Sequence, residues 1–299
     1  MLLFSYALEQ KDELSILRRI DFSDIFWIFW AVFLYNFINA LKFFFIYRIA
    51  GASLGIWESF GLSIVATTTN LILPGQAGGI VRGIYLHRLY QVPFSKVPAL
   101  MLGATVLNIS LAGIVLLIIN FALIFQGRMA PPIIWIISLL ASAAILSLWI
   151  KGPGWLSRKS GRILNMTRLF FEAWIGFRQN TGTLMLICLL QLLGFLSSGI
   201  VLWLAFRSLE VQVDVLSTTV LITATTPLSV VNILPGNVGL LEATIAYLSS
   251  ISGINFMHGL LAAGIRRIIS TVFVLALLPI SWFLLFKRKN ILLITQKRE

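Results

Sequence analysis

The sequence predicts an all-α fold, a polytopic bundle of transmembrane helices. Of its 299 residues, 59% are hydrophobic and only 11% are charged, whereas soluble domains carry about 25% charged residues. Several apolar stretches reach the roughly 20 residues that an α-helix needs to cross a bilayer. A transmembrane β-barrel would show short segments of alternating polarity rather than these long apolar blocks. We therefore expect a multi-pass integral protein of the cell membrane.

The excess of basic residues fits a membrane protein better than a nucleic-acid-binding one. The formal net charge is +12, and the basic residues collect in connections beside apolar segments, as the positive-inside rule describes. Cys188 is the only cysteine, so the sequence offers no disulfide framework or cysteine metal site. His87 and His258 lack partners at metal-ligand spacing. We expect no nucleic-acid partner, no metal and no cofactor.

A first transmembrane repeat is predicted at residues 24–150, after a surface segment of mixed charge at residues 1–23. Its apolar segments are residues 24–47, 54–73, 80–91, 94–125 and 132–150. The segment at 80–91 is too short to cross a bilayer alone. The first span carries Asn36, Asn39 and Lys42 close to one helical face. These side chains point into the bundle, unless Lys42 instead reaches the nearby interface.

A basic connection at residues 151–180 links this repeat to a second one at residues 181–286. The apolar segments of the second repeat are residues 181–206, 215–233, 238–251 and 256–286, and a basic tail follows at 287–299. The charged residues of the connection are Lys151, Arg158, Lys159, Arg162, Arg168, Glu172 and Arg178. Because both the connection and the tail are basic, we predict that both are cytoplasmic.

This placement implies a topology. The chain between two cytoplasmic segments crosses the membrane an even number of times, which two full spans and one returning hairpin at residues 232–251 satisfy. By the same count, a first hairpin at residues 70–91 opens toward the cytoplasm and the second toward the outside, and the amino terminus lies outside. We therefore expect two opposed re-entrant hairpins in an inverted repeat, the arrangement by which many transporters place a site at mid-membrane.

Each hairpin is predicted from a Pro-Gly break in an apolar segment. The first break reads LPGQAGG from Leu73, and the second reads LPGNVG from Leu234. Pro74 and Pro235 are 161 residues apart (235 − 74), and the same offset aligns Gly75 with Gly236, Gly78 with Gly239, and Gly103 with Gly264. Irregular backbone at membrane depth is tolerated only when it is buried in protein or lines a wet cavity. The breaks therefore predict a cavity.

The breaks also predict an anion site. A helix that starts after each break offers free N–H groups and the positive end of its dipole, and the glycines allow a ligand to approach the backbone. Gln76 and Asn237 place side-chain amides at matching positions. The residues expected to bind a lipid head group are Gly75, Gln76, Gly78, Arg82, Gly236, Asn237, Gly239, Glu242 and Arg266.

Two charged residues near the breaks have alternative interpretations. Arg82 can hold a phosphate with its planar fork, while Glu242 recognises a cationic group or positions the arginine. Alternatively, the two residues compensate each other, or Glu242 pairs with Arg266 or Arg267, because an unpaired charge in a membrane is costly.

From about residue 54 to residue 286, the chain resembles the lysylphosphatidylglycerol synthase transmembrane family, also called flippase-like membrane proteins. The family's first motif is similar to LPGRAGE followed by an arginine, and its second to PGGLG followed by a glutamate; Arg82 and Glu242 stand at these two places. Gln76 and Gly79 replace the motif's arginine and glutamate. Where the family often has ERxxD, this chain has ATVLN, with Asn108 in place of the acidic residue.

The resemblance implies translocation of a polar lipid between leaflets, either a phospholipid or a polyprenyl-linked glycolipid, each of which carries a phosphate. No catalytic constellation, phosphate-loop ending or HExxH motif is visible, so we expect no enzyme activity. The alternative is a membrane accessory subunit that docks a lipid-modifying enzyme or a glycosyltransferase through its basic connection.

Overall fold

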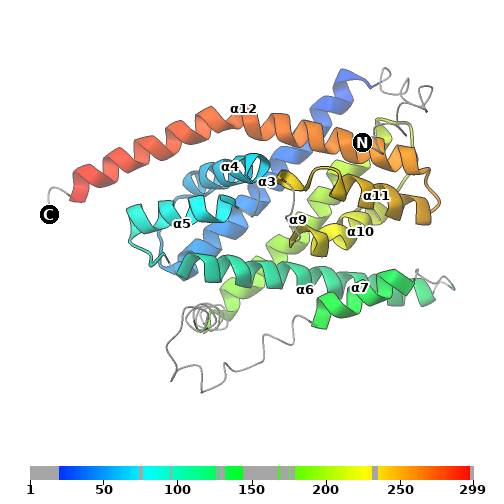
Figure 1. Cartoon of the computed structure of the whole chain (residues 1–299), viewed down its shortest axis with the longest axis horizontal. Helices are drawn as coiled ribbons and strands as arrows, with labels where there is room; N and C mark the ends of the chain where they lie inside the picture. Colours follow the sequence, from blue (N-terminus) through cyan, green and yellow to red (C-terminus); the bar gives the residue numbers. More distant parts are fainter. Residues whose placement is uncertain are drawn as a thin grey trace.

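The computed structural model describes residues 20–73, 77–94, 96–125, 127, 132–143, 168, 175, 179–230 and 235–296. These residues form helices and no strands, which confirms the predicted all-α class. The α-helices are α3 (Phe22–Ala50), α4 (Ile56–Ile72), α5 (Ala77–Tyr90), α6 (Lys96–Phe125), α7 (Pro132–Ala143), α9 (Thr181–Arg207), α10 (Val215–Thr225), α11 (Leu240–Ile251) and α12 (Phe256–Gln296) (Figure 1). Two short 3-10 helices, η4 (Thr226–Val230) and η5 (Pro235–Asn237), lie between α10 and α11.

Some of the predicted features fall outside the described residues. These are most of the amino-terminal surface segment, nearly all of the basic connection, Lys297 and Arg298 in the tail, and Pro74, Gly75 and Gln76 in the first break. The predicted binding roles of Gly75 and Gln76 therefore remain predictions.

Among the described residues, four helices are long and apolar enough to cross a membrane: Phe22–Ala50, Lys96–Ala122, Thr181–Arg207 and Phe256–Phe286. They correspond to four of the full-length spans expected from the sequence. α7 starts at Pro132, as predicted, and is described as far as Ala143, a length of 12 residues. The structure therefore supports a multi-pass integral membrane protein.

Local sequence explains where several helices start and stop. α3 ends at Gly51, whose φ of 94° is left-handed and whose N–H donates to the carbonyl of Arg48. Asp214 caps the start of α10, where its carboxylate accepts from the N–H of Ser217 at 2.8 Å. The segment predicted to run to residue 233 ends as α-helix at Thr225, because Pro227 cannot donate to the next turn.

The last helix is longer than the apolar segment predicts. α12 contains 41 residues and continues to Gln296 through part of the basic tail. Lysine and arginine are good helix formers, and no glycine or proline follows Phe286 to stop the helix. The change from apolar to basic residues therefore marks a change of environment and not the end of the helix.

The two sequence halves pack into one another. α3 from the first half packs against α9 from the second, and α4 packs against α12. One buried apolar cluster joins Phe60 to Leu202 and Phe273, and another joins Leu62 to Ile187 and Leu285. In the view of Figure 1, α12 runs along the upper edge of the bundle and α6 with α7 along the lower edge.

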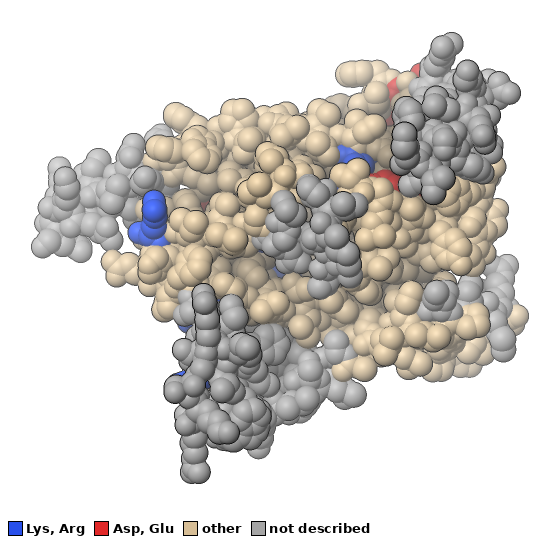
Figure 2. All heavy atoms as spheres, viewed as in Figure 1, with Lys and Arg blue, Asp and Glu red and all other residues tan. Residues whose placement is uncertain are grey.

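The described surface is consistent with lipid as solvent. On the face in Figure 2, charged side chains show only in small patches, and the rest of the described surface is uncharged. Large apolar side chains on the spans are exposed, among them Phe125 (90% exposed), Ile118, Val272 and Phe283. In water such a surface would be an aggregation liability, whereas in a bilayer it contacts acyl chains.

Candidate functional site: a cationic cavity between the repeats

A polar cavity of about 400 Å³ lies between the two halves of the chain. All the described α-helices except α7 contribute to its wall. Its polar lining residues are Tyr35, Asn39, Lys42, Thr67, Asn70, Arg82, Asn108, Gln191, Ser198, Thr225, Thr226 and Arg266. A cavity was expected near the breaks. The structure builds it from residues on eight separate α-helices, most of them remote from the breaks in sequence.

Arg82, on α5, is the most buried cation of this cavity, with 8% of its surface exposed. Its guanidinium lies 3.8 Å from the ring centroid of Phe43, and its Nη1 lies 3.9 Å from Sδ of Met101. Nε has no hydrogen-bond partner. Within the part of the chain that the structure describes, the side-chain contacts of Arg82 are with neutral groups, and neither Glu242 nor another carboxylate pairs with it.

Lys42, on α3, points into the same cavity. Its Nζ donates a hydrogen bond of 2.8 Å to Oε1 of Gln191 on α9, and it lies 5.1 Å from the Phe43 ring centroid. Of the two alternatives for Lys42, the structure shows the one that faces the bundle. Asn39 also lines the cavity, whereas Asn36 donates to the carbonyl of Val32 in its own helix.

Arg266, on α12, brings a cation from the second half. Its Nη2 donates to the hydroxyl of Ser198 at 3.0 Å. Arg82 and Arg266 were both predicted to contact a head group, and the structure places them on one cavity. Two cations that are far apart in the sequence thus lie on one cavity, where both can contact the same ligand.

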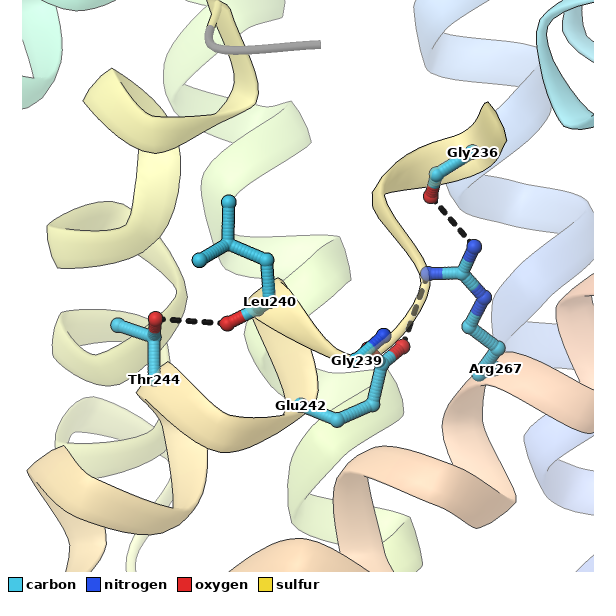
Figure 3. A network of polar contacts seen from close by, with 6 residues as sticks. All are labelled: Gly236, Gly239, Leu240, Glu242, Thr244 and Arg267. Atoms are coloured by element: carbon cyan, nitrogen blue, oxygen red, sulfur yellow. Dashed lines mark hydrogen bonds and ion pairs between the residues drawn. The ribbon is translucent and has the colours of Figure 1, made fainter. Parts of the chain in front are cut away.

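The second break forms a closed polar network, separate from the cavity lining (Figure 3). Arg267 on α12 pairs with Oε1 of Glu242 at 2.8 Å and also donates to the carbonyl of Gly236. The other carboxylate oxygen, Oε2, accepts from the N–H of Gly239 at 2.7 Å. Among the alternatives for Glu242, the structure thus shows pairing with Arg267. Gly236, Gly239 and Glu242 stabilise the break and do not line the cavity.

The first break has a comparable cap. The N–H of Gly78 donates to Oδ1 of Asn70 at 2.7 Å, as the N–H of Gly239 does to Glu242. Because these two equivalent N–H groups already have protein acceptors, they are not the free anion donors that the sequence predicted. A Cβ on Gly78 would lie 2.2 Å from the carbonyl oxygen of Ala66, so this glycine serves close packing of α5 on α4.

Asn237, the amide predicted in the second repeat, lies next to this network rather than on the cavity. Its side chain is buried, with 5% exposed, and its Oδ1 has no hydrogen-bond partner. Its φ of 54° is left-handed, a conformation that asparagine tolerates better than most residues. The structure gives Asn237 a place in the turn and no contact with the cavity.

Comparison with known proteins agrees with the motifs. A family model described as "Lysylphosphatidylglycerol synthase TM region" matches residues 1–277. The chain belongs to this family. No curated protein and no solved structure matches the chain. The resemblance drawn from the two Pro-Gly motifs is confirmed, and the match extends further toward the amino terminus than those motifs do.

In this member of the lysylphosphatidylglycerol synthase transmembrane family, sequence reasoning missed several cavity residues. Gln191, Ser198 and Asn108 are polar residues inside long apolar helices, and each lines the cavity. A polar residue within a span usually faces the bundle interior, so this signal was present in the sequence. It did not show which of these residues meet, because they lie on different helices.

Proposed function

We propose that the protein binds the phosphate-bearing head group of a membrane lipid in this cavity and moves the lipid between leaflets. One observation carries the proposal: Lys42, Arg82 and Arg266 line a single cavity at the centre of an apolar bundle. Uncompensated cations in such a place lower stability, so their presence indicates a function.

Phosphate suits these residues chemically. An arginine guanidinium forms paired, charge-assisted hydrogen bonds to phosphate oxygens, and lysine contributes a compact charge. Attraction between opposite charges is several times stronger in a protein interior than in water. The buried Nε of Arg82 has no hydrogen-bond partner, and a shift of this side chain on binding would offer that donor to the ligand.

A second observation favours an amphipathic ligand. An apolar groove of about 1180 Å³ lies between α4 and α12, lined by Ile72, Leu73, Trp282 and Phe283 among others. α4 contributes Thr67 and Asn70 to the polar cavity and Val65, Thr68 and Thr69 to the groove. One helix thus presents a polar wall on one side and an apolar wall on the other, as a lipid with a charged head and hydrocarbon tails needs.

The proposal includes a mechanism of access. The pairs α4–α5 and α10–α11 follow the 161-residue repeat of the Pro-Gly motifs. We assign them as re-entrant hairpins that enter from opposite faces, so that movement of one repeat against the other exposes the cavity to each leaflet in turn.

The test is transfer of head-group-labelled phospholipid and polyprenyl phosphate in vesicles that contain the purified protein. Arg82→Ala should slow transfer about ten-fold or more, since a ten-fold change corresponds to about 1.4 kcal/mol and a buried charge contact is worth at least that. Arg48→Ala is the matched control, because Arg48 also lies over a phenylalanine ring, 4.6 Å from that of Phe44, but is exposed. Equal rates for wild type and Arg82→Ala would refute this site.

If the wild-type protein transfers no lipid, the accessory role becomes the better proposal. The basic connection at residues 151–180 would then dock a lipid-modifying enzyme or glycosyltransferase. Deleting residues 158–168 should abolish capture of that partner, while Arg82→Ala should leave capture intact.

A further inference from the structure

The described neighbours of the cavity's basic side chains are neutral. Lys42 contacts Gln191, Arg266 contacts Ser198, and Arg82 contacts Phe43 and Met101, all of which are neutral. Among the described residues that line the cavity there is no aspartate or glutamate. Lys42, Arg82 and Arg266 therefore share a space of about 400 Å³ to which the described residues contribute no carboxylate.

The acidic residues of the helical bundle are committed elsewhere. Glu58 on α4 accepts hydrogen bonds from the hydroxyls of Tyr85 and Tyr90 at 2.8 and 2.6 Å. Glu242 is held by Arg267 and by the N–H of Gly239. Between residues 25 and 171 and again between residues 215 and 298, these are the only acidic residues in the sequence. The charge of Glu242 also acts on Arg266, but its carboxylate is already paired with Arg267, so these three residues together keep a net positive charge.

This arrangement limits what the cavity can hold. A head group with an ammonium, such as an aminoacylated one, would place that cation beside three others with no carboxylate to receive it. A phosphodiester with one negative charge would balance only one of the three. A phosphomonoester or diphosphate, with two or three negative charges, balances most of the charge.

We infer that the cavity selects a lipid whose head carries a phosphomonoester or diphosphate and no ammonium, and that it rejects aminoacyl-phosphatidylglycerol. This inference rests on the proposed function and narrows its substrate class. The family takes its name from lysylphosphatidylglycerol synthase, and the charge of this cavity is opposite to what cationic lysylphosphatidylglycerol requires.

The experiment is competitive lipid binding to the purified full-length chain, measured by native mass spectrometry. The probes are a polyprenyl diphosphate, phosphatidic acid, phosphatidylglycerol and lysylphosphatidylglycerol at equal concentration, with soluble pyrophosphate as a competitor. The diphosphate lipid and phosphatidic acid should be retained about ten-fold or more over lysylphosphatidylglycerol. They lack the ammonium groups that the cavity's cations would repel, and their phosphates carry more negative charge for those cations to attract.

Substitutions at two cavity positions, with one at an exposed position as control, test whether the cavity sets this order. Gln191→Glu keeps the shape of the side chain and adds a carboxylate 2.8 Å from Nζ of Lys42. It should reduce the preference for the diphosphate lipid about ten-fold. Arg82→Lys retains the charge and should preserve the order of lipids, whereas Arg82→Gln should weaken it. Arg48→Gln, at the exposed position, should change nothing.

The outcomes separate the two proposals. Equal or tighter binding of lysylphosphatidylglycerol, sensitive to Arg82→Gln, would overturn the charge selection and leave a phosphate-lipid site in place. Retention of bulk lipid alone by every variant would overturn both. Displacement of the diphosphate lipid by an equal concentration of pyrophosphate would support the preference for a diphosphate. It would overturn the proposal that the ligand is a lipid. The predicted order, reversed in part by Gln191→Glu, supports the inference.

Discussion

Arg267 and Glu242 form an ion pair of 2.8 Å that ties α12 to the first turn of α11, and the same guanidinium holds the carbonyl of Gly236. The neighbouring Arg266 faces the cavity instead and meets Ser198. Consecutive residues on a helix point about 100° apart, so these two adjacent arginines face different neighbours. Arg267 stabilises the break, and Arg266 contributes charge to the cavity.

The first prediction follows from this division. Arg267→Gln should lower the free energy of unfolding by about 1–3 kcal/mol, because it leaves Glu242 without its cation in a site where the two side chains are only 20% and 13% exposed. Arg266→Gln, the matched control, should leave stability unchanged or raise it, since Arg266 is bonded to the hydroxyl of Ser198 and to no carboxylate of the described residues. Thermal unfolding in detergent measures both. Equal destabilisation by the two substitutions would contradict this assignment.

The second prediction concerns Gly78. Gly78→Ala should destabilise the protein by about 1–3 kcal/mol, because its Cβ would overlap the carbonyl of Ala66, only 2.2 Å away. Gly79→Ala is the control, since nothing lies within 4 Å of its Cβ position. It should be neutral or stabilising by up to about 1 kcal/mol, owing to the better helix propensity of alanine. A comparison of melting temperatures decides, and a stable Gly78→Ala protein would show that α4 and α5 are not packed this closely.

The third prediction is that stability and binding change in opposite directions at Lys42. Lys42→Met removes a cation that has only a neutral partner, so it should raise the free energy of unfolding by about 1–2 kcal/mol. The same substitution should weaken binding of a phosphate-bearing lipid about ten-fold, as expected when function is the reason for a destabilising residue. Unfolding curves and lipid retention on the same preparation test both halves. A loss of stability would show that Lys42 has a structural role instead.

The fourth prediction is a pH effect outside the spans. Hydrogen bonds from the side chain and the N–H of Ser217 hold the pKa of Asp214 below its usual value, which is about 3.9 in an unfolded chain. A carboxylate with a lowered pKa stabilises the fold above that value, and this contribution is lost as the pH falls through the folded pKa.

Asp214→Ala should therefore cost about 1 kcal/mol at neutral pH through loss of the helix cap, an amount kept small by the solvent exposure of Asp214. The difference from wild type should shrink below about pH 4. Asp214→Asn should keep most of the cap without this pH dependence. Unfolding measured across pH 3 to about 7 tests the point, and a constant difference would refute it.

The sequence alone showed that the helices are surrounded by lipid, and this predicted the fold class. Long apolar segments and basic connections indicate helices in lipid because backbone amides in a bilayer have no other way to pair. It also located most helices, because each follows a long apolar segment. It missed the end of α10, since the apolar segment continues past Pro227. The Pro-Gly motifs were enough to indicate the family.

Only the tertiary structure decided the partners of the charged residues. Glu242 had three arginines as candidate partners, and the rotation of α12 brought Arg267 to it, while Arg266 and Arg82 went to the cavity. The same packing turned Lys42 toward Gln191, 149 residues away in the chain. Local sequence fixes which face of a helix is polar, but the energy of a charge depends on groups that other helices supply, and those distances exist only once the helices have packed.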